Sequence, residues 1–145
     1  MNPTAPFLKS KTIDDAAEDY LRNDGSLFSV SEFKRHAVIR NNPVNFKYGS
    51  KSPRTQELDP VYFINFIFIF VNKSKMISNF ETYGHCLYTA PIRHRLVTGL
   101  EGWDIDDEHD FEIAELALAA GKTPAKATYH PSIAEKIAKG EEFKN

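Results

Sequence analysis

Two aspartates separated by one residue, Asp104 and Asp106, are the side chains of this sequence best suited to chemistry. They flank Ile105, so an extended backbone would direct both carboxylates to one face and the isoleucine into the core. Two carboxylates held in this way are the oxygen ligands that Mg²⁺ takes when waters and a substrate phosphate complete its octahedron. We therefore predict that a strand ends at these residues and carries a Mg²⁺ site.

The residues that follow also have an explanation that needs no metal. A helix is predicted to begin here and to end at Gly121, with Asp107 as its cap and Asp110 as the capping-box partner three positions on. Acidic residues are favoured in the first turn of any helix because the helix dipole is positive there. An acid-rich helix start is thus the structural alternative to a metal pair.

Composition narrows the class of protein. The chain has 145 residues, 41% of them hydrophobic, which suits one domain with a core. The net charge is -2 and the basic residues are scattered, so nucleic acid is not an expected partner. The single cysteine, Cys86, excludes an internal disulfide and fits a reducing compartment. The first residues lack the basic and apolar parts of a signal peptide, so we expect a cytoplasmic protein.

The most apolar segment is Val61–Val71, which is rich in aromatic and β-branched residues. It is too short to cross a bilayer as a helix and contains Asn65, so no membrane association is expected. Such a segment predicts a strand at the centre of a sheet, buried on both faces by helices. This is the first indication of an α/β fold.

Apolar periodicity and turn residues predict the remaining elements. They are a helix over Thr12–Asn23, strands over Ser26–Ser31, Ala37–Arg40 and Val44–Phe46, a helix over Ser74–Phe80 and a strand over Leu87–Pro91. A capping box from Thr12 to Asp15 would begin the first helix. The turn residues at 41–43 predict that the strands on either side form a short antiparallel pair.

The last segment, Lys122–Asn145, is rich in lysine and alanine. Ser132 and Glu135 could cap a short helix that stops at Gly140. This helix either docks its apolar face on the domain or frays as a tail, and the sequence favours neither interpretation.

Five segments carry a family resemblance. They are Asn2–Phe7, Ser29–Glu32, Pro53–Gln56, Tyr62–Ile77, and Asp104–Asp106 with the helix after it. In content and order they resemble the CMP-sialic acid synthetases, the acylneuraminate cytidylyltransferases, over nearly the whole chain up to about residue 120. The resemblance implies a partial doubly wound mixed sheet of the nucleotide-diphospho-sugar transferase type. It also implies a short antiparallel dimerisation arm at about residues 33–56.

For the site, the resemblance implies specific roles. Such enzymes join a sialic-type (nonulosonic) sugar acid to CMP by attack of its anomeric hydroxyl on the α-phosphate of CTP, with release of pyrophosphate. Asp104 and Asp106 match the family's Mg²⁺-binding pair. Arg54, with Gln56 beside it, matches an arginine that crosses to the second subunit and holds the sugar carboxylate, and Asn2 matches an amide of the sugar pocket. The expected partners are the sugar acid, CTP and a second copy of the chain in a homodimer.

The sequence also departs from the family. A central-strand aromatic of the family falls at Ile69, and the Gly-rich, basic loop that cradles the triphosphate has no counterpart because all the glycines are isolated. We therefore expect residues 1–121 to be the C-terminal part of a cytidylyltransferase-like domain that cannot bind CTP unaided.

Three functions stay open at this point. The chain is part of an active cytidylyltransferase completed by another polypeptide, or a non-catalytic truncated relative that serves as a dimerisation or binding module. The third is an unrelated α/β binding module, in which Arg54 would be a solvated charge in a polar loop.

Overall fold

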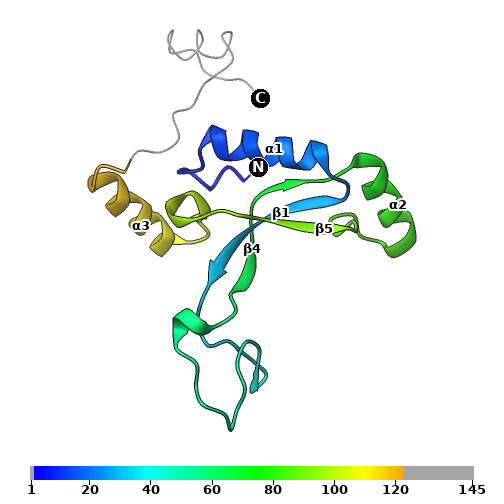
Figure 1. Ribbon diagram of the computed structural model, residues 1–145. Helices are drawn as coiled ribbons and strands as arrows, with labels where there is room; N and C mark the ends of the chain where they lie inside the picture. The colour runs from blue at the N-terminus through cyan, green and yellow to red at the C-terminus, as the bar shows by residue number, and fades with distance from the viewer. Residues whose placement is uncertain (1, 123–145) are drawn as a thin grey trace.

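Figure 1 shows helix α1 (Ser10–Arg22) lying across one face of a small sheet in the computed structural model, which describes residues 2–122. The sheet has three strands in the order β4-β1-β5. Strand β1 (Ser26–Phe33) lies in the middle, antiparallel to β4 (Val61–Phe70) and parallel to β5 (Ile92–Leu96). This mixed sheet with helices agrees with the predicted α/β class. The predicted tail, from residue 123 onward, lies outside the described residues.

Helix α1 packs on the sheet through one apolar side. Ile13, Ala16 and Tyr20 are three or four positions apart, so they share that side of the helix. Ala16 is fully buried, and the ring of Tyr20 stacks on Phe70 of β4 with ring centroids 5.5 Å apart. The buried residues that complete this core are Ala5, Leu8, Leu27, Ile67, Phe68 and Val97. The helix predicted at Thr12–Asn23 is therefore confirmed.

The capping box predicted from Thr12 to Asp15 is wrong. The helix begins at Ser10, and Lys9 at the N-cap position makes no side-chain cap hydrogen bond. The Thr12 hydroxyl donates instead to a carboxylate oxygen of Glu101, 89 positions along the chain. A tertiary hydrogen bond has replaced the local cap.

The apolar sequence of β4 predicts a strand at the centre of the sheet, but this prediction is wrong. Strand β4 lies at an edge of the described sheet. Within β4 only Ile67 and Phe68 are buried, whereas Phe63 is 54% exposed. The centre is β1, whose first five residues are buried and include Ser26 and Ser29. Serines suggest a half-exposed strand, but here both hydroxyls make buried hydrogen bonds to backbone carbonyls. The strand predicted over Ser26–Ser31 is confirmed, but its serines gave no indication that it is the buried, central one.

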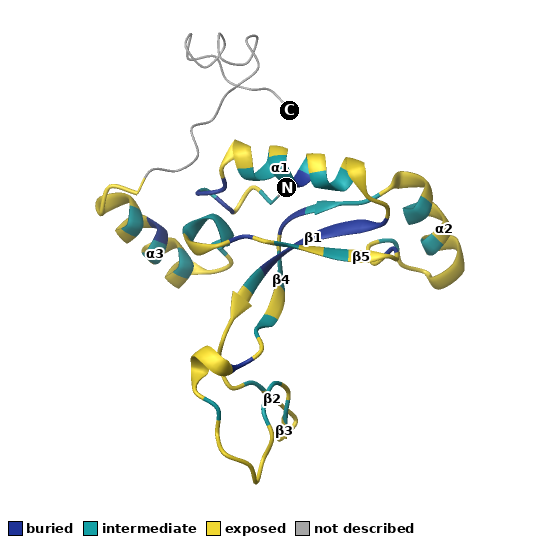
Figure 2. Cartoon of the chain, viewed as in Figure 1, coloured by how far each residue is buried: buried dark blue, intermediate teal, exposed yellow. Residues whose placement is uncertain are grey.

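Residues 34–60 leave the sheet between β1 and β4 and project away from it, and they contain most of the predicted arm (Figure 1). Figure 2 shows that this projecting segment is exposed or half-buried almost throughout, with Leu58 as its buried residue. It contains two short strands and a 3-10 turn. These are β2 (Val38–Ile39), β3 (Asn42–Pro43) and η1 (Thr55–Glu57).

The predicted antiparallel pair in the projecting segment is confirmed, with a different second strand. Ile39 is opposite Asn42, and Arg40 and Asn41 between them both have positive φ, 48° and 67°. Two such residues make the tight hairpin turn that matches strand twist. The second strand is therefore Asn42–Pro43 and not Val44–Phe46, because the chain reverses before Asn42.

Helix α2 (Lys73–Tyr83) confirms the helix predicted near Ser74–Phe80. Asn72 caps it by accepting a hydrogen bond from the backbone N–H of Lys75, and Gly84 ends it in the left-handed conformation. The predicted strand at Leu87–Pro91 is wrong, because the strand begins directly after it, as β5.

Strand β5 alternates between two environments. Arg93 and Arg95 turn toward α1, where they lie 2.9 Å from Asp19 and 3.9 Å from Asp15. Its apolar residues, Ile92 and Leu96, turn to the opposite face of the sheet, where each is 40% exposed. The sequence did not predict this strand, because arginines are not expected on a face that a helix covers. Their pairing with the aspartates of α1 makes that position possible. Between residues 2 and 122, no helix combines the length and apolar character needed to cross a bilayer.

Candidate functional site

The segment that carries Asp104 and Asp106 is not the predicted strand. After β5 the chain forms a 3-10 turn, η2 (Gly99–Gly102), and residues 103–106 then run irregularly into α3 (Glu108–Ala119). The backbone N–H of Ile105 donates to the carbonyl of Thr4 at 3.1 Å, so this segment is held by the N-terminal residues. A strand fails to form because no sheet neighbour lies beside it in the described part of the chain.

Asp104 is hydrogen-bonded to the N-terminal residues through both carboxylate oxygens. Asn2 Nδ2 donates to Oδ2 at 2.8 Å, and the Thr4 hydroxyl donates to Oδ1. The same hydroxyl lies 2.7 Å from Asn2 Oδ1, which also accepts from the Thr4 backbone N–H at 3.3 Å. Asn2 and Asp104, both predicted site residues, are thus in direct contact across 102 positions of sequence.

A bulge in β4 holds Asn2 in place. On β1, Phe28 pairs with Ile69 and Val30 with Ile64, so β4 uses more residues than β1 over this stretch. Phe66 within the bulge has a φ of 53°, which is uncommon for a bulky residue. The carbonyl of Ile67 beside it accepts a 2.7 Å hydrogen bond from the backbone N–H of Asn2. The bulge therefore fixes the segment that holds Asp104.

The Asp106 carboxylate accepts no hydrogen bond from residues 2–122. The backbone N–H of Asp106 donates to Asp110 Oδ2 at 3.1 Å, and the backbone N–H of Asp110 donates to Asp107 Oδ1 at 3.0 Å. The predicted Asp107 cap is confirmed, but Asp110 reaches one residue further back than a capping box requires. Trp103 Nε1 also donates to the Asp110 carbonyl at 3.2 Å. These contacts fix the backbone at Asp106 without involving its carboxylate.

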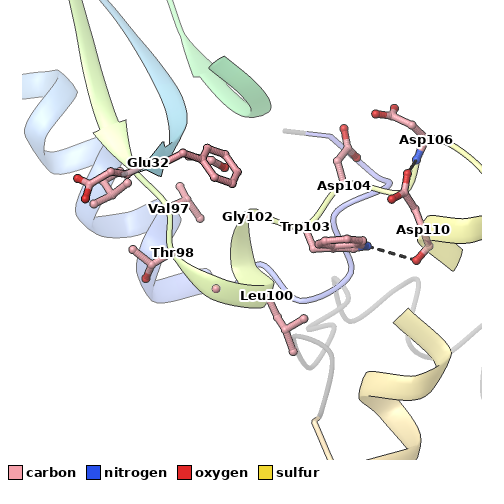
Figure 3. Close-up of a pocket in the computed structure, with 13 residues that line it drawn as sticks. Glu32, Val97, Thr98, Leu100, Gly102, Trp103, Asp104, Asp106 and Asp110 are labelled. Carbon is pink, nitrogen blue, oxygen red and sulfur yellow. Dashed lines mark hydrogen bonds between the residues drawn. The ribbon is translucent and has the colours of Figure 1, made fainter. Parts of the chain in front are cut away.

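Asp104 and Asp106 line the same cavity, which has a volume of about 720 Å³ (Figure 3). Glu32 and Asp110 also line it, together with the aromatic ring of Trp103. None of its described lining residues is basic. The charged groups that line this cavity are therefore all acidic, and they would repel an anionic ligand unless a cation accompanied it.

This donor set fits Mg²⁺ only in part. Asp104 and Asp106 supply hard oxygen ligands, and the Asp104 carboxylate keeps free lone pairs after accepting two hydrogen bonds. Within residues 2–122, no group of three or more His, Cys, Asp or Glu is arranged to hold a metal ion. The two aspartates could therefore hold Mg²⁺ if waters and ligand phosphates completed its coordination.

Arg54 and Gln56 do not line this cavity. Both are exposed in the projecting segment, where the Arg54 guanidinium donates to Glu57 Oε1 through Nε at 2.9 Å and Nη2 at 2.7 Å. The hydrogen bonds from the backbone and side chain of Arg54 hold the pKa of Glu57 below its usual value. The structure thus brings Asn2, Asp104 and Asp106 together within one chain but not Arg54 or Gln56.

Thr4 is the site residue that sequence reasoning missed as an individual side chain. It lies within the Asn2–Phe7 segment that carries the family resemblance, but only the structure places its hydroxyl against Asp104. Comparison with models of known protein families and with curated proteins gives no match. The site is therefore interpreted from its own geometry.

Proposed function

We propose that this chain carries the metal-binding and sugar-binding part of a cytidylyltransferase that activates a sialic-type (nonulosonic) sugar acid with CTP. One observation carries the proposal: segments of the resemblance that are far apart in sequence meet at one place. Asn2 contacts both Asp104 and the backbone of Ile67, and the hydroxyl of Ser29 bonds to the backbone of Phe68. Four of the five segments are thus joined by hydrogen bonds, and two of them, Ser29–Glu32 and Asp104–Asp106 with its helix, supply residues to the acidic cavity.

The finer fold is part of the same proposal. Pairing of β1 with a parallel β5 on one side and an antiparallel β4 on the other is the arrangement expected within a mixed, doubly wound sheet. The described strands would be one portion of that sheet. The projecting segment between β1 and β4 would be its dimerisation arm.

In this function the cavity residues bind and orient. Asp104 and Asp106 present carboxylate oxygens that would hold Mg²⁺ on the phosphates of CTP. Bound Mg²⁺ would neutralise phosphate charge and orient the α-phosphate for attack. The anomeric oxygen of the sugar acid then forms a bond to the α-phosphorus, the bond to pyrophosphate breaks, and the hydroxyl proton is released. No side chain is assigned as the base.

Arg54 would act from the second subunit. Its guanidinium can grip a sugar carboxylate with two parallel hydrogen bonds, as it now grips Glu57 within its own chain. The arm projects away from the sheet of its own chain (Figure 1). Arg54 would therefore reach the cavity of a partner subunit and not the cavity of its own chain. Asn2 keeps a second Nδ2 hydrogen beyond the one donated to Asp104, and we assign that hydrogen to the sugar.

The triphosphate cradle would come from sequence other than residues 2–122, because no Gly-rich loop followed by a helix occurs in them. The decisive assay measures CMP-sugar formation from CTP and a panel of nonulosonic acids. The chain is tested alone and with a polypeptide that carries a Gly-rich, basic loop. Activity that needs both polypeptides and is lost in Asp106→Asn supports the proposal, and no activity in any combination contradicts it.

A second candidate function is a non-catalytic dimerisation module. The observation that favours it is the apolar surface on and beside the arm, since several large side chains there are 40% exposed or more. These residues are Phe33, Val38, Ile39, Val44, Tyr48, Tyr62 and Phe63. Exposed apolar surface of this kind marks association sites. A dimer by light scattering that becomes a monomer in Ile39→Lys, together with no transferase activity, would favour this candidate.

A further inference from the structure

We infer that Thr4 is a positioning residue whose hydroxyl fixes the Asp104 carboxylate for cation binding. The inference rests on the proposed function, because it concerns the same metal pair. It adds a residue to which neither the sequence patterns nor the family resemblance assigns a role.

The geometry places Thr4 directly on the carboxylate. Its hydroxyl donates to Asp104 Oδ1 while Asn2 Nδ2 donates to Oδ2 at 2.8 Å, so each carboxylate oxygen has its own donor. Two donors on opposite oxygens fix the rotation of the carboxylate group, which a single donor would leave free. The Thr4 hydroxyl has one hydrogen, which is assigned here to Asp104 although Asn2 Oδ1 lies within reach at 2.7 Å. Because Asn2 and Thr4 both donate to Asp104, the three side chains form one connected network.

The hydroxyl is not needed to hold the two segments together. The carbonyl of Thr4 already accepts from the N–H of Ile105 at 3.1 Å, and the N–H of Asn2 already donates to Ile67 at 2.7 Å. Both are backbone hydrogen bonds, so a change of the Thr4 side chain to valine or serine removes neither their donors nor their acceptors. Thr4 itself is exposed, so loss of its hydroxyl leaves no buried cavity. Its side chain therefore acts on the orientation of Asp104 and contributes little to the fold.

Asp104 and Asp106 are held in different ways, which makes this role specific. The carboxylate of Asp106 accepts no hydrogen bond from residues 2–122, and Asp110 fixes only its backbone. Asp104 is thus the one of the pair that is oriented before a cation arrives. Groups that orient a metal ligand typically change metal affinity about 10- to 100-fold when they are removed.

The test is a titration of Mn²⁺ into the full chain, tagged at its C-terminus and followed by water proton relaxation, because Mn²⁺ takes the same oxygen ligands as Mg²⁺. Thr4→Val keeps the shape and removes the hydroxyl, and Thr4→Ser keeps the hydroxyl. We expect Thr4→Val to raise the Kd for Mn²⁺ about tenfold and Thr4→Ser to stay within about threefold of the unaltered chain.

Two controls separate the possible failures. Thr12→Val removes the hydroxyl that donates to Glu101, another threonine–carboxylate pair, and it should leave the Kd for Mn²⁺ unchanged. Asp104→Asn should abolish the binding. Binding that persists in Asp104→Asn overturns the proposed metal site, and the inference with it. Loss of binding in Asp104→Asn with an unchanged Kd in Thr4→Val overturns the inference alone, as does a Thr4→Val chain that does not fold.

Discussion

The hydroxyl of Ser29 makes two hydrogen bonds to the backbone of Phe68, donating to its carbonyl and accepting from its N–H, each at 3.0 Å. Both residues are buried. A side chain of the central strand therefore replaces the regular ladder at the bulge of β4. At the same bulge, the carbonyl of Ile67 accepts from the backbone N–H of Asn2, which in turn contacts Asp104. Ser29 therefore helps to hold the candidate site in place through the bulge.

Ser29→Ala should destabilise the protein by about 2 kcal/mol, because it leaves the buried N–H and carbonyl of Phe68 without partners. Urea unfolding followed by circular dichroism measures the free energy of unfolding. Ser50→Ala is the matched control, since that hydroxyl makes an exposed hydrogen bond, and its effect should stay within about 0.5 kcal/mol. Equal effects of the two substitutions would contradict the assignment.

Phe66→Gly should be more stable than Phe66→Ala by about 1 kcal/mol. Both substitutions remove the ring that lies edge-on to Phe28, with centroids 6.3 Å apart, but only glycine relieves the backbone strain at a φ of 53°. The comparison of the two variants isolates that strain. Thermal and urea unfolding provide the measurement, and an alanine variant at least as stable as the glycine variant would show that no strain is stored there.

The stability of the protein should depend on Glu101 at acidic pH. Burial raises the pKa of this carboxyl, but hydrogen bonds from Lys9 and Thr12 outweigh burial and hold it below the usual value. A lowered folded-state pKa stabilises the fold above the unfolded-state pKa, about 4.3, and this contribution is lost as pH falls through the folded-state value. Glu101→Gln should therefore flatten the acidic limb of a plot of stability against pH. Thr12→Val should flatten it partly, and an unchanged limb in both variants would contradict the prediction.

Mg²⁺ alone should bind the chain only at millimolar concentrations or above. Within residues 2–122 no third acidic, histidine or cysteine ligand joins the pair, so without added triphosphate most of the octahedron is left to water. Calorimetric titration should detect weak binding that disappears in Asp104→Ala. Tight, stoichiometric binding to the chain alone would mean that the protein supplies further ligands and that the nucleotide is not required.

In a reconstituted active enzyme, Arg54→Lys should raise the KM for the sugar acid about tenfold, because lysine cannot reproduce the two-pronged hydrogen bonding of a guanidinium. The KM for CTP should hardly change, since Arg54 is assigned to the sugar carboxylate. Glu57→Gln removes the carboxylate charge that Arg54 now pairs with, so it should not raise the sugar KM. Equal effects of Arg54→Lys on both substrates would assign Arg54 to the fold of the arm.

Local patterns in the sequence determined the helices and the turns. The spacing of Ile13, Ala16 and Tyr20 defines the buried side of α1, and Asp107 predicts the start of α3. The predicted turn residues 41–43 locate the hairpin of the projecting segment to within one residue, since the turn itself is Arg40–Asn41. Each of these features depends on residues within one or two turns of chain, so the sequence alone was sufficient.

Only the tertiary structure decided which strand is central and how the site is assembled. Buried hydrogen bonds made Ser26 and Ser29 acceptable in the middle of the sheet, while the more apolar β4 became an edge. The sequence selected Asp104 and Asp106, but it placed them on a strand that does not form. The contact of Asn2 and Thr4 with Asp104 joins residues about one hundred positions apart. No local periodicity encodes such a contact, because it depends on how the β4 bulge and the segment before α3 meet.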